Sequence, residues 1–395
     1  MRRVVYGVLP HLKQTSRTLR TRPEFMQELV EKVTENNNNL PPPALTAKCC
    51  DYFKQLDKHG KRDFFKILAT EFDVDRENAV KEAKAYVHEQ NKSVEQNLLH
   101  YLEPKYGLFF DRIHQLPNGL KLLADMRSDL LDIMGQRESE SYLEFTSLEQ
   151  DIRLKLKKYV IGFLKLEQLT WQTSSAELLE KICSYEAVHA VKDWKDIKRR
   201  LASDRRVFAF VENTTPNEPL VFVHVALVPS ISTSVQAILN EPLPPKEGKH
   251  FKCAICYSIT TQQGLGGINL GNYLIKQVVD RLKTQYPQLE TFATLSPLPG
   301  FRKWLMHHDE SDPSIVAELG LGWKTEMATF EGQEQWKDPL MRLCARYILD
   351  EKRIETNALD PVGTRTSTYE MERVRIKFIG KEIHLTRECM NPLAL

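Results

Sequence analysis

The segment Phe251–Leu305 has the sequence FKCAICYSITTQQGLGGINLGNYLIKQVVDRLKTQYPQLETFATLSPLPGFRKWL and decides the fold. Alternation over Cys253–Ile259 predicts a half-buried strand, and apolar residues at helical spacing in Leu274–Leu282 predict a helix. A second strand is expected at Thr291–Leu295. Because one helix connects the two strands, we expect a parallel pair with a ligand crevice at its carboxyl ends.

Glycines crowd the turn between the first strand and the helix. Gly264, Gly266, Gly267 and Gly271 lie within eight residues. Backbone N–H groups can approach an anion there, and the positive dipole end of the helix favours pyrophosphate, so a nucleotide or coenzyme A is the predicted ligand. Ser296 ends the second strand and is expected at the same crevice. It lacks the flanking glycines of a nucleophile elbow, which sets a hydrolase of that type aside.

The segment before this unit changes pattern around Leu169. Helical periodicity dominates from Ala44 to about Lys165, where Ser93 and Gln96 have capping-box spacing. One apolar stripe of this region consists of Leu123, Met126, Leu130 and Ile133. After Leu169 the sequence predicts strands at Arg206–Val211 and Pro219–Val228, with a hairpin loop over Asn213–Pro219. A helical bundle followed by a mixed α/β domain is therefore expected.

Five segments resemble the malonyl-CoA decarboxylase family: TTQQGLGGINLGNYLIK, TLSPLPGFRKWL, EAVHAVKDWKDIKRRL, EPLVFVHVAL and PLMRLCARYIL. The resemblance covers the chain from about Ala44 to Gly363. It implies an α+β fold of two domains, in which an all-helical N-terminal bundle precedes a mixed α/β acyltransferase-like domain of the GNAT acetyltransferase type. We expect a presequence and linker without packed structure over 1–43, the bundle over 44–168, and the catalytic domain over 169–395.

The resemblance also implies an enzyme, a carboxy-lyase that converts malonyl-CoA to acetyl-CoA and CO2 in the regulation of fatty acid synthesis and oxidation. Ser296 matches the family's catalytic proton acceptor. The coenzyme-binding positions are Gly266, Gly267, Ile268, Asn269, Leu270, Gly271 and Asn272. No metal or organic cofactor is expected, because the thioester carbonyl accepts the electrons and coenzyme A is part of the substrate. A homo-oligomer is implied by resemblance alone.

The family's catalytic histidine has no counterpart in the expected context. The family continues past ALDPV with a short run that carries FHL and NGA, whereas the divergent tail from residue 364 reads TRTSTYEMERVRIKFIGKEIHLTRECMNPLAL. His384 lies in an unrelated context there. A truncated or spliced form, impaired in catalysis but able to bind acyl-CoA, therefore stays open as an alternative. So does a GNAT-type N-acyltransferase, since the same turn serves acyl transfer to amines.

The composition argues against several other classes of protein. The 395 residues carry a net charge of +2 and no basic stripe with interleaved aromatics, so nucleic-acid binding is not expected. No window reaches the roughly 18 apolar residues of a membrane span. The seven cysteines make no disulfide framework, and Cys253 and Cys256 form a lone CxxC in a strand pattern that predicts a structural role.

Residues 1–23 are basic and rich in hydroxyl side chains, with Glu24 as the first acidic residue. This composition is typical of a mitochondrial presequence and predicts the mitochondrial matrix, although a solvated basic tail has the same composition. The C-terminal residues NPLAL are no peroxisomal address of the SKL type. The cytoplasm and the peroxisome remain alternatives.

Several charged and titratable residues admit two interpretations. His224 in FVHVAL fits a hydrogen-bonded core histidine better than a catalytic one, and His189 has no role assigned by its neighbours. The adjacent pair His307 and His308 is not expected to bind a metal. An arginine cluster either contacts coenzyme A phosphates or forms a solvated face; it comprises Arg199, Arg200, Arg205 and Arg206.

Overall fold

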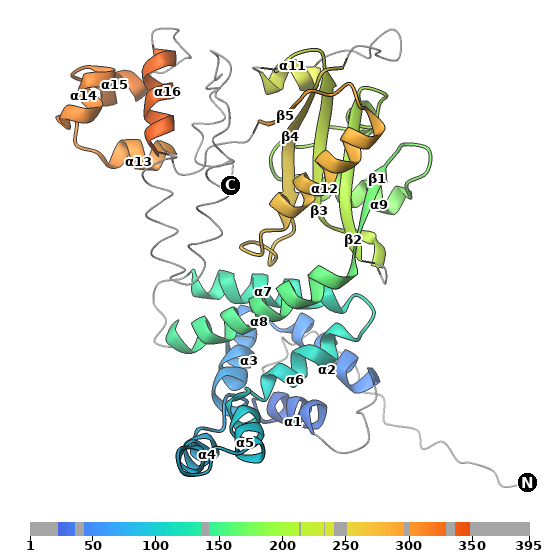
Figure 1. Cartoon of the computed structure of the whole chain (residues 1–395), viewed down its shortest axis with the longest axis vertical. Helices are drawn as coiled ribbons and strands as arrows, with labels where there is room; N and C mark the ends of the chain where they lie inside the picture. The colour runs from blue at the N-terminus through green and yellow to red at the C-terminus, as the bar shows by residue number, and fades with distance from the viewer. Residues whose placement is uncertain are drawn as a thin grey trace, which may run out of the picture. The chain divides into compact units, whose positions relative to one another are not determined.

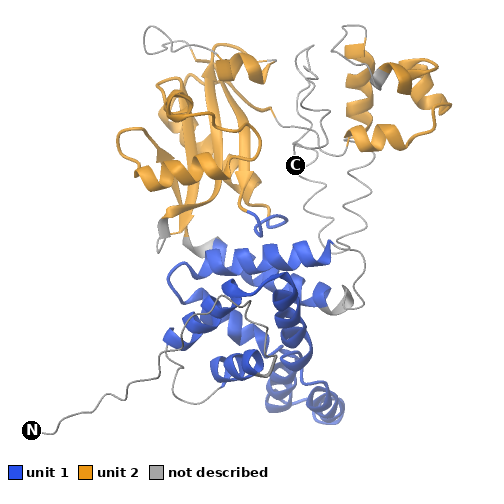
Figure 2. Cartoon of the chain, turned by 180° about the vertical axis from the view of Figure 1, so that it is seen from behind, with its two compact units in different colours: residues 1–162, 263–268 blue, residues 163–262, 269–395 orange. Residues whose placement is uncertain are grey.

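The computed structural model describes residues 23–35, 43–135, 142–212, 215–232, 234–240, 251–295, 301–328 and 336–347. The chain divides into two compact units, which are coloured separately in Figure 2. The first comprises residues 1–162 together with 263–268, and the second comprises 163–262 together with 269–395. The glycine turn that leads the sequence analysis therefore begins in the helical unit and ends in the second one.

The regular secondary structure described in the first unit consists of helices, which Figure 1 shows in blue to green. They are α1 (Pro23–Thr34), α2 (Pro43–Gln55), α3 (Lys58–Glu71), α4 (Arg76–His88), α5 (Lys92–Leu102), α6 (Tyr106–His114), α7 (Gly119–Met134) and α8 (Tyr142–Phe163). The apolar stripe predicted on α7 is buried at every position, which confirms it. Phenylalanines of α2, α3 and α6 pack against one another as tilted rings, with centroids 5.1 Å apart for Phe53 and Phe64 and 6.0 Å apart for Phe64 and Phe109.

Two sequence expectations about this unit are wrong. Residues 23–34 lie in the range assigned to presequence and linker, but they form α1, whose Met26, Leu29, Val30 and Val33 are buried. These apolar residues recur at helical spacing, so the helix can bury one face against its neighbours. The capping box at Ser93 is also wrong, because Asn91 caps α5 by accepting a hydrogen bond from the Val94 amide at 3.0 Å.

The second unit contains a five-stranded sheet in the order β1-β2-β3-β4-β5. The strands are β1 (Leu164–Leu169), β2 (Arg205–Glu212), β3 (Thr215–Val228), β4 (Cys253–Thr261) and β5 (Thr291–Thr294). The first three pairings are antiparallel, and β4 pairs with β5 in parallel, as the sequence predicted for these two strands. The sheet therefore has the mixed topology expected of an α/β domain that follows a helical region.

Strand ends differ from the sequence expectations at two places. β1 covers Leu164–Leu169, before the change of pattern placed at Leu169, because every residue from Leu164 to Leu169 pairs with β2. The hairpin loop expected over Asn213–Pro219 is wrong in extent, since Thr215 already pairs with Glu212. Val211 pairs with Pro219 and Glu212 pairs with Thr215, so the register shifts between these two pairs. The additional β3 residues between Thr215 and Pro219 form an irregularity within the strand pairing and not a loop.

Helices cover both faces of the sheet. Helices α9 (Ala176–Tyr185) and α10 (Trp194–Arg200) share a core with Val207, Ala209 and Val211 of β2. The alternate residue Phe210 points to the opposite face and stacks on Tyr273 of α12 (Leu270–Gln285), with ring centroids 5.3 Å apart. Figure 1 shows α12 lying along the sheet. The predicted stripe on α12 is confirmed by the burial of Leu274, Val278 and Leu282.

The remaining described helices form smaller clusters. Helix α11 (Val235–Asn240) contributes Ile238 to an apolar cluster with β3 and β4. Four helices after β5 share a core around Trp323, and these are α13 (Phe301–His307), α14 (Pro313–Leu319), α15 (Trp323–Ala328) and α16 (Lys337–Arg346). No helix in the described part of the chain has the length and apolarity that a bilayer span requires.

Candidate functional site

The parallel pair β4 and β5 stops before β4 ends. The last paired residues are Cys256 and Thr294, and the Leu295 amide donates to the Cys256 carbonyl at 2.9 Å. On the other edge of β4, Val225 pairs with Cys256 and His224 pairs with Ser258, so Tyr257 is an extra residue that bulges. In the described residues no strand continues β5 alongside Tyr257–Thr261. Among the described residues the parallel pairing therefore ends at Cys256 and Thr294, five residues before β4 ends.

The glycine turn follows β4 and has an unusual backbone. Gly264 and Gly267 have φ of +80° and +76°, and Asn269 has φ of +63°. At Gly264 a side chain is excluded outright, because a Cβ would lie 1.8 Å from the carbonyl oxygen of Ala124 on α7. Gly266 has open space around it. The turn thus contacts α7 closely through Gly264 and keeps Gly266 exposed to solvent.

A buried arginine holds the same turn. Arg127 of α7 is 3% exposed, and its Nη1 donates to the carbonyl oxygens of Gly264 at 2.6 Å and Gly266 at 2.7 Å. Its Nε and Nη2 donate to Oε1 of Glu149 on α8 at 2.9 and 2.6 Å. The Glu149 carboxylate therefore balances the charge of the guanidinium group, and the Nη1 nitrogen donates to the two backbone carbonyls.

Helix α12 begins where the turn ends. Asn269 is its left-handed N-cap, without a side-chain capping hydrogen bond, and the Tyr273 amide donates to the Asn269 carbonyl at 3.3 Å. The first turn of α12 lies against β4, where a Cβ at Gly271 would make an ordinary contact of 3.5 Å with Cγ2 of Ile259. The first amides of a helix have no partner within the helix and carry its positive dipole end, so this helix start can bind an anion.

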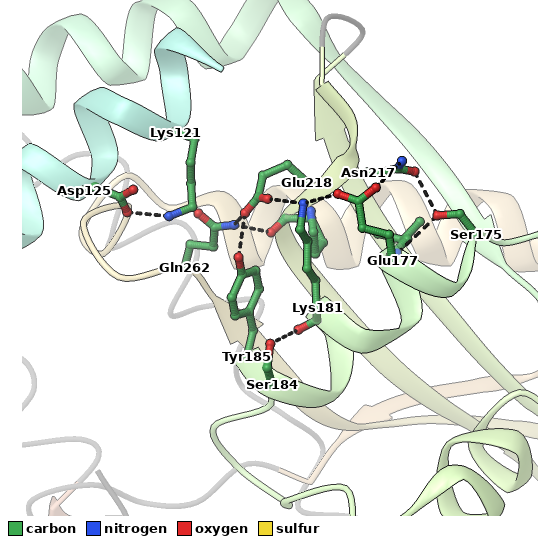
Figure 3. Close-up of polar contacts among 12 residues, drawn as sticks. Lys121, Asp125, Ser175, Glu177, Lys181, Ser184, Tyr185, Asn217, Glu218 and Gln262 are labelled. Atoms are coloured by element: carbon green, nitrogen blue, oxygen red, sulfur yellow. Dashed lines mark hydrogen bonds and ion pairs between the residues drawn. The ribbon is translucent and has the colours of Figure 1, made fainter. Parts of the chain in front are cut away.

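A buried carboxylate fixes the end of β4 just before the turn. The Gln262 side-chain amide donates to Glu218 and, at 2.7 Å, to the Pro219 carbonyl. Glu218 also accepts from the Tyr185 hydroxyl at 3.0 Å and pairs with Lys181 at 2.9 Å. Figure 3 shows Lys181 and Tyr185 of α9 and Gln262, which follows β4, converging on Glu218. Because Gln262 directly precedes the turn, the network fixes the point from which the turn departs.

A second buried network lies at the Tyr257 bulge. His224 is fully buried, and its Nε2 lies 3.0 Å from Oε2 of Glu186. The other oxygen, Oε1, accepts from the Ser258 hydroxyl at 2.7 Å and the Val188 amide at 2.8 Å. Burial raises the pKa of Glu186, but the hydrogen bond and charge of His224 outweigh burial and lower that pKa to about 2. The expectation of a core histidine at His224 is confirmed by its complete burial beside Glu186.

The predicted arginine cluster follows neither of its two interpretations. Arg199 binds Asp204 through both terminal nitrogens at 2.7 and 2.8 Å, and Arg205 binds Asp204 at 2.6 Å. Arg200 pairs with Asp196 and donates to the His189 carbonyl at 2.8 Å, and Arg206 donates to the Ser203 carbonyl at 2.8 Å. These arginines are engaged in local ion pairs and carbonyl contacts, so they stabilise the segment that leads into β2.

The cysteines of the CxxC pair and the histidine His308 are held by packing and local contacts. Cys253 and Cys256 are buried in β4, and burial raises the pKa of Cys256 to about 12. His308 Nδ1 lies 2.9 Å from Asp312 Oδ2, and its ring packs against Trp304. Among the described residues, no three His, Cys, Asp or Glu side chains gather as a metal site.

Family comparison identifies the chain. The model of the malonyl-CoA decarboxylase C-terminal domain matches residues 162–384, and that of the N-terminal domain matches residues 72–159. The chain belongs to the malonyl-CoA decarboxylase family. The C-terminal match extends past Gly363, where the sequence resemblance was expected to end, and it includes His384.

Several members of the malonyl-CoA decarboxylase family are similar over most of this chain. The mitochondrial malonyl-CoA decarboxylase of Anser anser anser is 33% identical over 387 residues, which cover 88% of this chain and 76% of the goose protein. The mitochondrial enzyme of Mus musculus is 38% identical over 298 residues, which cover 68% of this chain and 60% of the mouse protein.

Solved structures agree with the family assignment. The crystal structure of malonyl-CoA decarboxylase from Rhodopseudomonas palustris has a TM-score of 0.72 and 29% identity, and it covers 84% of this chain and 81% of that chain. The protein of the same name from Agrobacterium vitis has a TM-score of 0.65 and 30% identity, with 77% and 76% covered. A helical region followed by a mixed α/β domain is thus shared with known malonyl-CoA decarboxylases.

The predicted site residues are described only in part. Residues Gly266–Asn272 form the end of the turn and the start of α12; Gly266, Gly267 and Asn269 are exposed, whereas Ile268 and Leu270 are buried. Ser296, the predicted catalytic residue, and His384 lie outside the described residues. Sequence reasoning missed Arg127 and Glu149, because an arginine and a glutamate on helices carry no motif and the turn they hold is 137 residues further along from Arg127.

Proposed function

We propose that this chain is a malonyl-CoA decarboxylase that converts malonyl-CoA to acetyl-CoA and CO2. The observation that carries the proposal is the match of both family domains, joined to a glycine turn that follows β4 and ends at the start of helix α12. In the proposed complex the coenzyme diphosphate binds at Gly266–Asn272, and Ser296 lies beside the thioester. Ser296 follows Leu295, whose amide donates to the Cys256 carbonyl of β4.

The chemistry that this site must support is electrostatic. The bond between the carboxylate carbon and the α-carbon breaks, and its electron pair moves toward the thioester carbonyl to give an enolate as CO2 leaves. A proton then bonds to the α-carbon. The protein has to orient the carboxylate, supply donors to the enolate oxygen and deliver this proton. A serine hydroxyl both donates and accepts, so Ser296 suits one of these roles.

The finer fold type follows from the same family membership. We infer that the second unit is an acyltransferase-like domain of the GNAT type, which is supported by the mixed sheet, the parallel β4–β5 pair and the bulge at Tyr257. We also infer a homo-oligomer and a mitochondrial location, the latter because similar curated relatives are named mitochondrial. Coenzyme A enters as part of the substrate, and no further cofactor is proposed.

A direct assay tests the function. Malonyl-CoA labelled in its free carboxyl group is incubated with the purified chain, and released CO2 and acetyl-CoA are measured together. Equal amounts of the two products are expected, and Ser296→Ala should lose this activity while it retains coenzyme A binding. Ser184→Ala, at an exposed serine that bonds a carbonyl of α9, is the matched control. Unchanged turnover in Ser296→Ala would refute the assigned role.

A second candidate is favoured by the tail sequence. The run with FHL and NGA that follows ALDPV in the family is replaced after Gly363, so the expected catalytic histidine is missing from its context. An acyl-CoA-binding form with impaired turnover is the function that this difference supports. Calorimetry showing coenzyme A binding by a chain that releases no CO2 would favour it over the decarboxylase. Acyl-CoA consumption that requires an added amine would instead indicate an N-acyltransferase.

A further inference from the structure

Arg127 is more than a core ion pair. A buried pair of opposite charges in a helical core is often replaced by apolar side chains without loss of stability, so packing α7 against α8 does not by itself require an arginine. The Nη1 nitrogen of Arg127 donates hydrogen bonds to two carbonyl oxygens of the glycine turn, those of Gly264 and Gly266. Those carbonyls belong to the segment that leads into the proposed coenzyme-binding residues.

The contacts fix the direction of two peptide groups. In a trans peptide the carbonyl and the following N–H point in opposite directions, and the described residues contain no cis peptide. Because the carbonyls of Gly264 and Gly266 point to Arg127, the amides of Leu265 and Gly267 point away from it. Gly266 and Gly267 are both exposed. The Gly267 amide therefore points away from the guanidinium, on an exposed stretch of backbone.

Electrostatics gives this orientation a consequence for an anion. A carbonyl oxygen that faced a diphosphate would repel it, whereas an amide that faces it donates a hydrogen bond. Glu149 completes the arrangement, because its Oε1 accepts two hydrogen bonds from Arg127 and so aligns the guanidinium fork. The partly exposed Arg153 lies 4.0 Å from the same carboxylate, so the two guanidinium groups and one carboxylate carry a net positive charge.

We propose that Arg127, aligned by Glu149, is a positioning residue that sets the coenzyme-binding turn by drawing two carbonyls away from the anion. Arg127 does not contact the ligand and acts through the backbone of Gly264–Gly267. The identity of the ligand rests on the proposed function. The role of Arg127 in the turn is a separate claim with its own test.

The structure offers a matched control for this test. Arg112 of α6 is also buried in the helical unit, and its guanidinium donates to the Val33 and Glu35 carbonyls. Arg112→Lys and Arg127→Lys therefore remove the same kind of group from the same kind of partner. An ammonium cannot reproduce the planar guanidinium that serves two carbonyls at once in each case, so both variants should lose some stability. Only Arg127→Lys should weaken the binding of coenzyme A.

The primary measurement is the dissociation constant of coenzyme A, determined by calorimetry on the full chain. We expect Arg127→Lys to weaken binding at least about tenfold, the effect of losing well-placed hydrogen bonds to a charged ligand, and Arg112→Lys to bind within about twofold of the wild type. Decarboxylation should show the same division, with a raised KM for malonyl-CoA and little change in kcat. Hydrogen exchange of peptides covering 263–272 should be faster in Arg127→Lys alone.

Glu149→Gln is the second variant, and it tests the positioning role of Arg127 if Arg127→Lys does not fold. It keeps the shape and loses the charge that aligns Arg127, so we expect coenzyme A to bind about three- to tenfold more weakly. If the wild type binds coenzyme A and the folded variants bind it equally well, the positioning role is overturned while the proposed function stands. If the wild type does not bind coenzyme A, the proposed function fails and the inference fails with it.

Discussion

His224 Nε2 lies 3.0 Å from Oε2 of Glu186, and both side chains are completely buried. The pair lies beside the Tyr257 bulge of β4, where Ser258 donates to the same carboxylate. The amides of Val188 and His189 also donate to Glu186, at 2.8 and 3.0 Å. One carboxylate thus joins the segment after α9 to β3 and β4, so its charge state matters to the stability of the whole second unit.

Stability of the second unit should therefore depend on pH through Glu186. Its pKa is about 2 in the folded protein against an ordinary 4.5, so the carboxylate stabilises the fold fully above about 4.5 and loses this effect as the pH falls toward 2. Glu186→Gln should lower the free energy of unfolding at pH 7 by about 3 kcal/mol. Urea titrations at several pH values should show the gap to wild type staying constant above about pH 5 and narrowing as the pH falls from 5 toward 2. A gap that stays constant over this range would contradict the assignment.

The glycines of the turn should differ sharply in what they tolerate. Gly264→Ala places a Cβ 1.8 Å from the Ala124 carbonyl at a positive φ, so we expect a loss of at least about 3 kcal/mol or failure to fold. Gly266→Ala points into open space and should change the free energy of unfolding by less than about 1 kcal/mol. Chemical denaturation of both variants checks this. Equal stability of the two would show that the turn does not lie against α7 as described.

Asp204 should be essential to the segment that leads into β2. It binds Arg199 and Arg205, and its side chain is 5% exposed. Asp204→Asn leaves two guanidinium groups without their carboxylate, so we expect a loss of about 3–5 kcal/mol in the free energy of unfolding. Glu290→Gln is the control, because its pair with Lys252 is exposed and should contribute less than about 1 kcal/mol. Similar values for the two variants would contradict the difference in burial.

The tail should limit the rate and not the binding of the coenzyme. Replacing residues 364–395 by a family segment that carries FHL and NGA should raise kcat for CO2 release by about a hundredfold or more, since a general acid typically contributes this much. The dissociation constant of coenzyme A should stay within about twofold.

His384→Ala in the present chain is the control for the tail exchange. It should leave kcat unchanged, because His384 lacks the expected neighbours. A large loss of kcat in this variant would instead identify His384 as the missing proton donor.

The sequence was most informative where local pattern and structure coincide. Cys253–Ile259, the glycine turn, α12 and the strand at Thr291 were all predictable, because each has its own periodicity or turn chemistry and one helix between two strands constrains their direction. The α7 stripe was predictable for the same reason.

Other features were not predictable because distant partners create them. β1 is a strand because it pairs with β2. Its sequence, LKLEQL, follows a long helix without a break in composition, so nothing local marks the start of a strand. The role of Arg127 depends on a turn far along the chain, and Glu186 and His224 meet only because β3 carries one to the segment that holds the other. Single-sequence patterns contain no information about such contacts.

The central claim is that the backbone from Gly266 to Asn272 binds the diphosphate of coenzyme A. A crystal structure of the chain with coenzyme A tests it most directly. The predicted result places diphosphate oxygens within hydrogen-bond distance of amides in this segment, with the Gly264 and Gly266 carbonyls still bound to Arg127 and the Ser296 hydroxyl facing the thiol end. A diphosphate bound elsewhere, or a Ser296 hydroxyl buried away from the thiol, would contradict the claim.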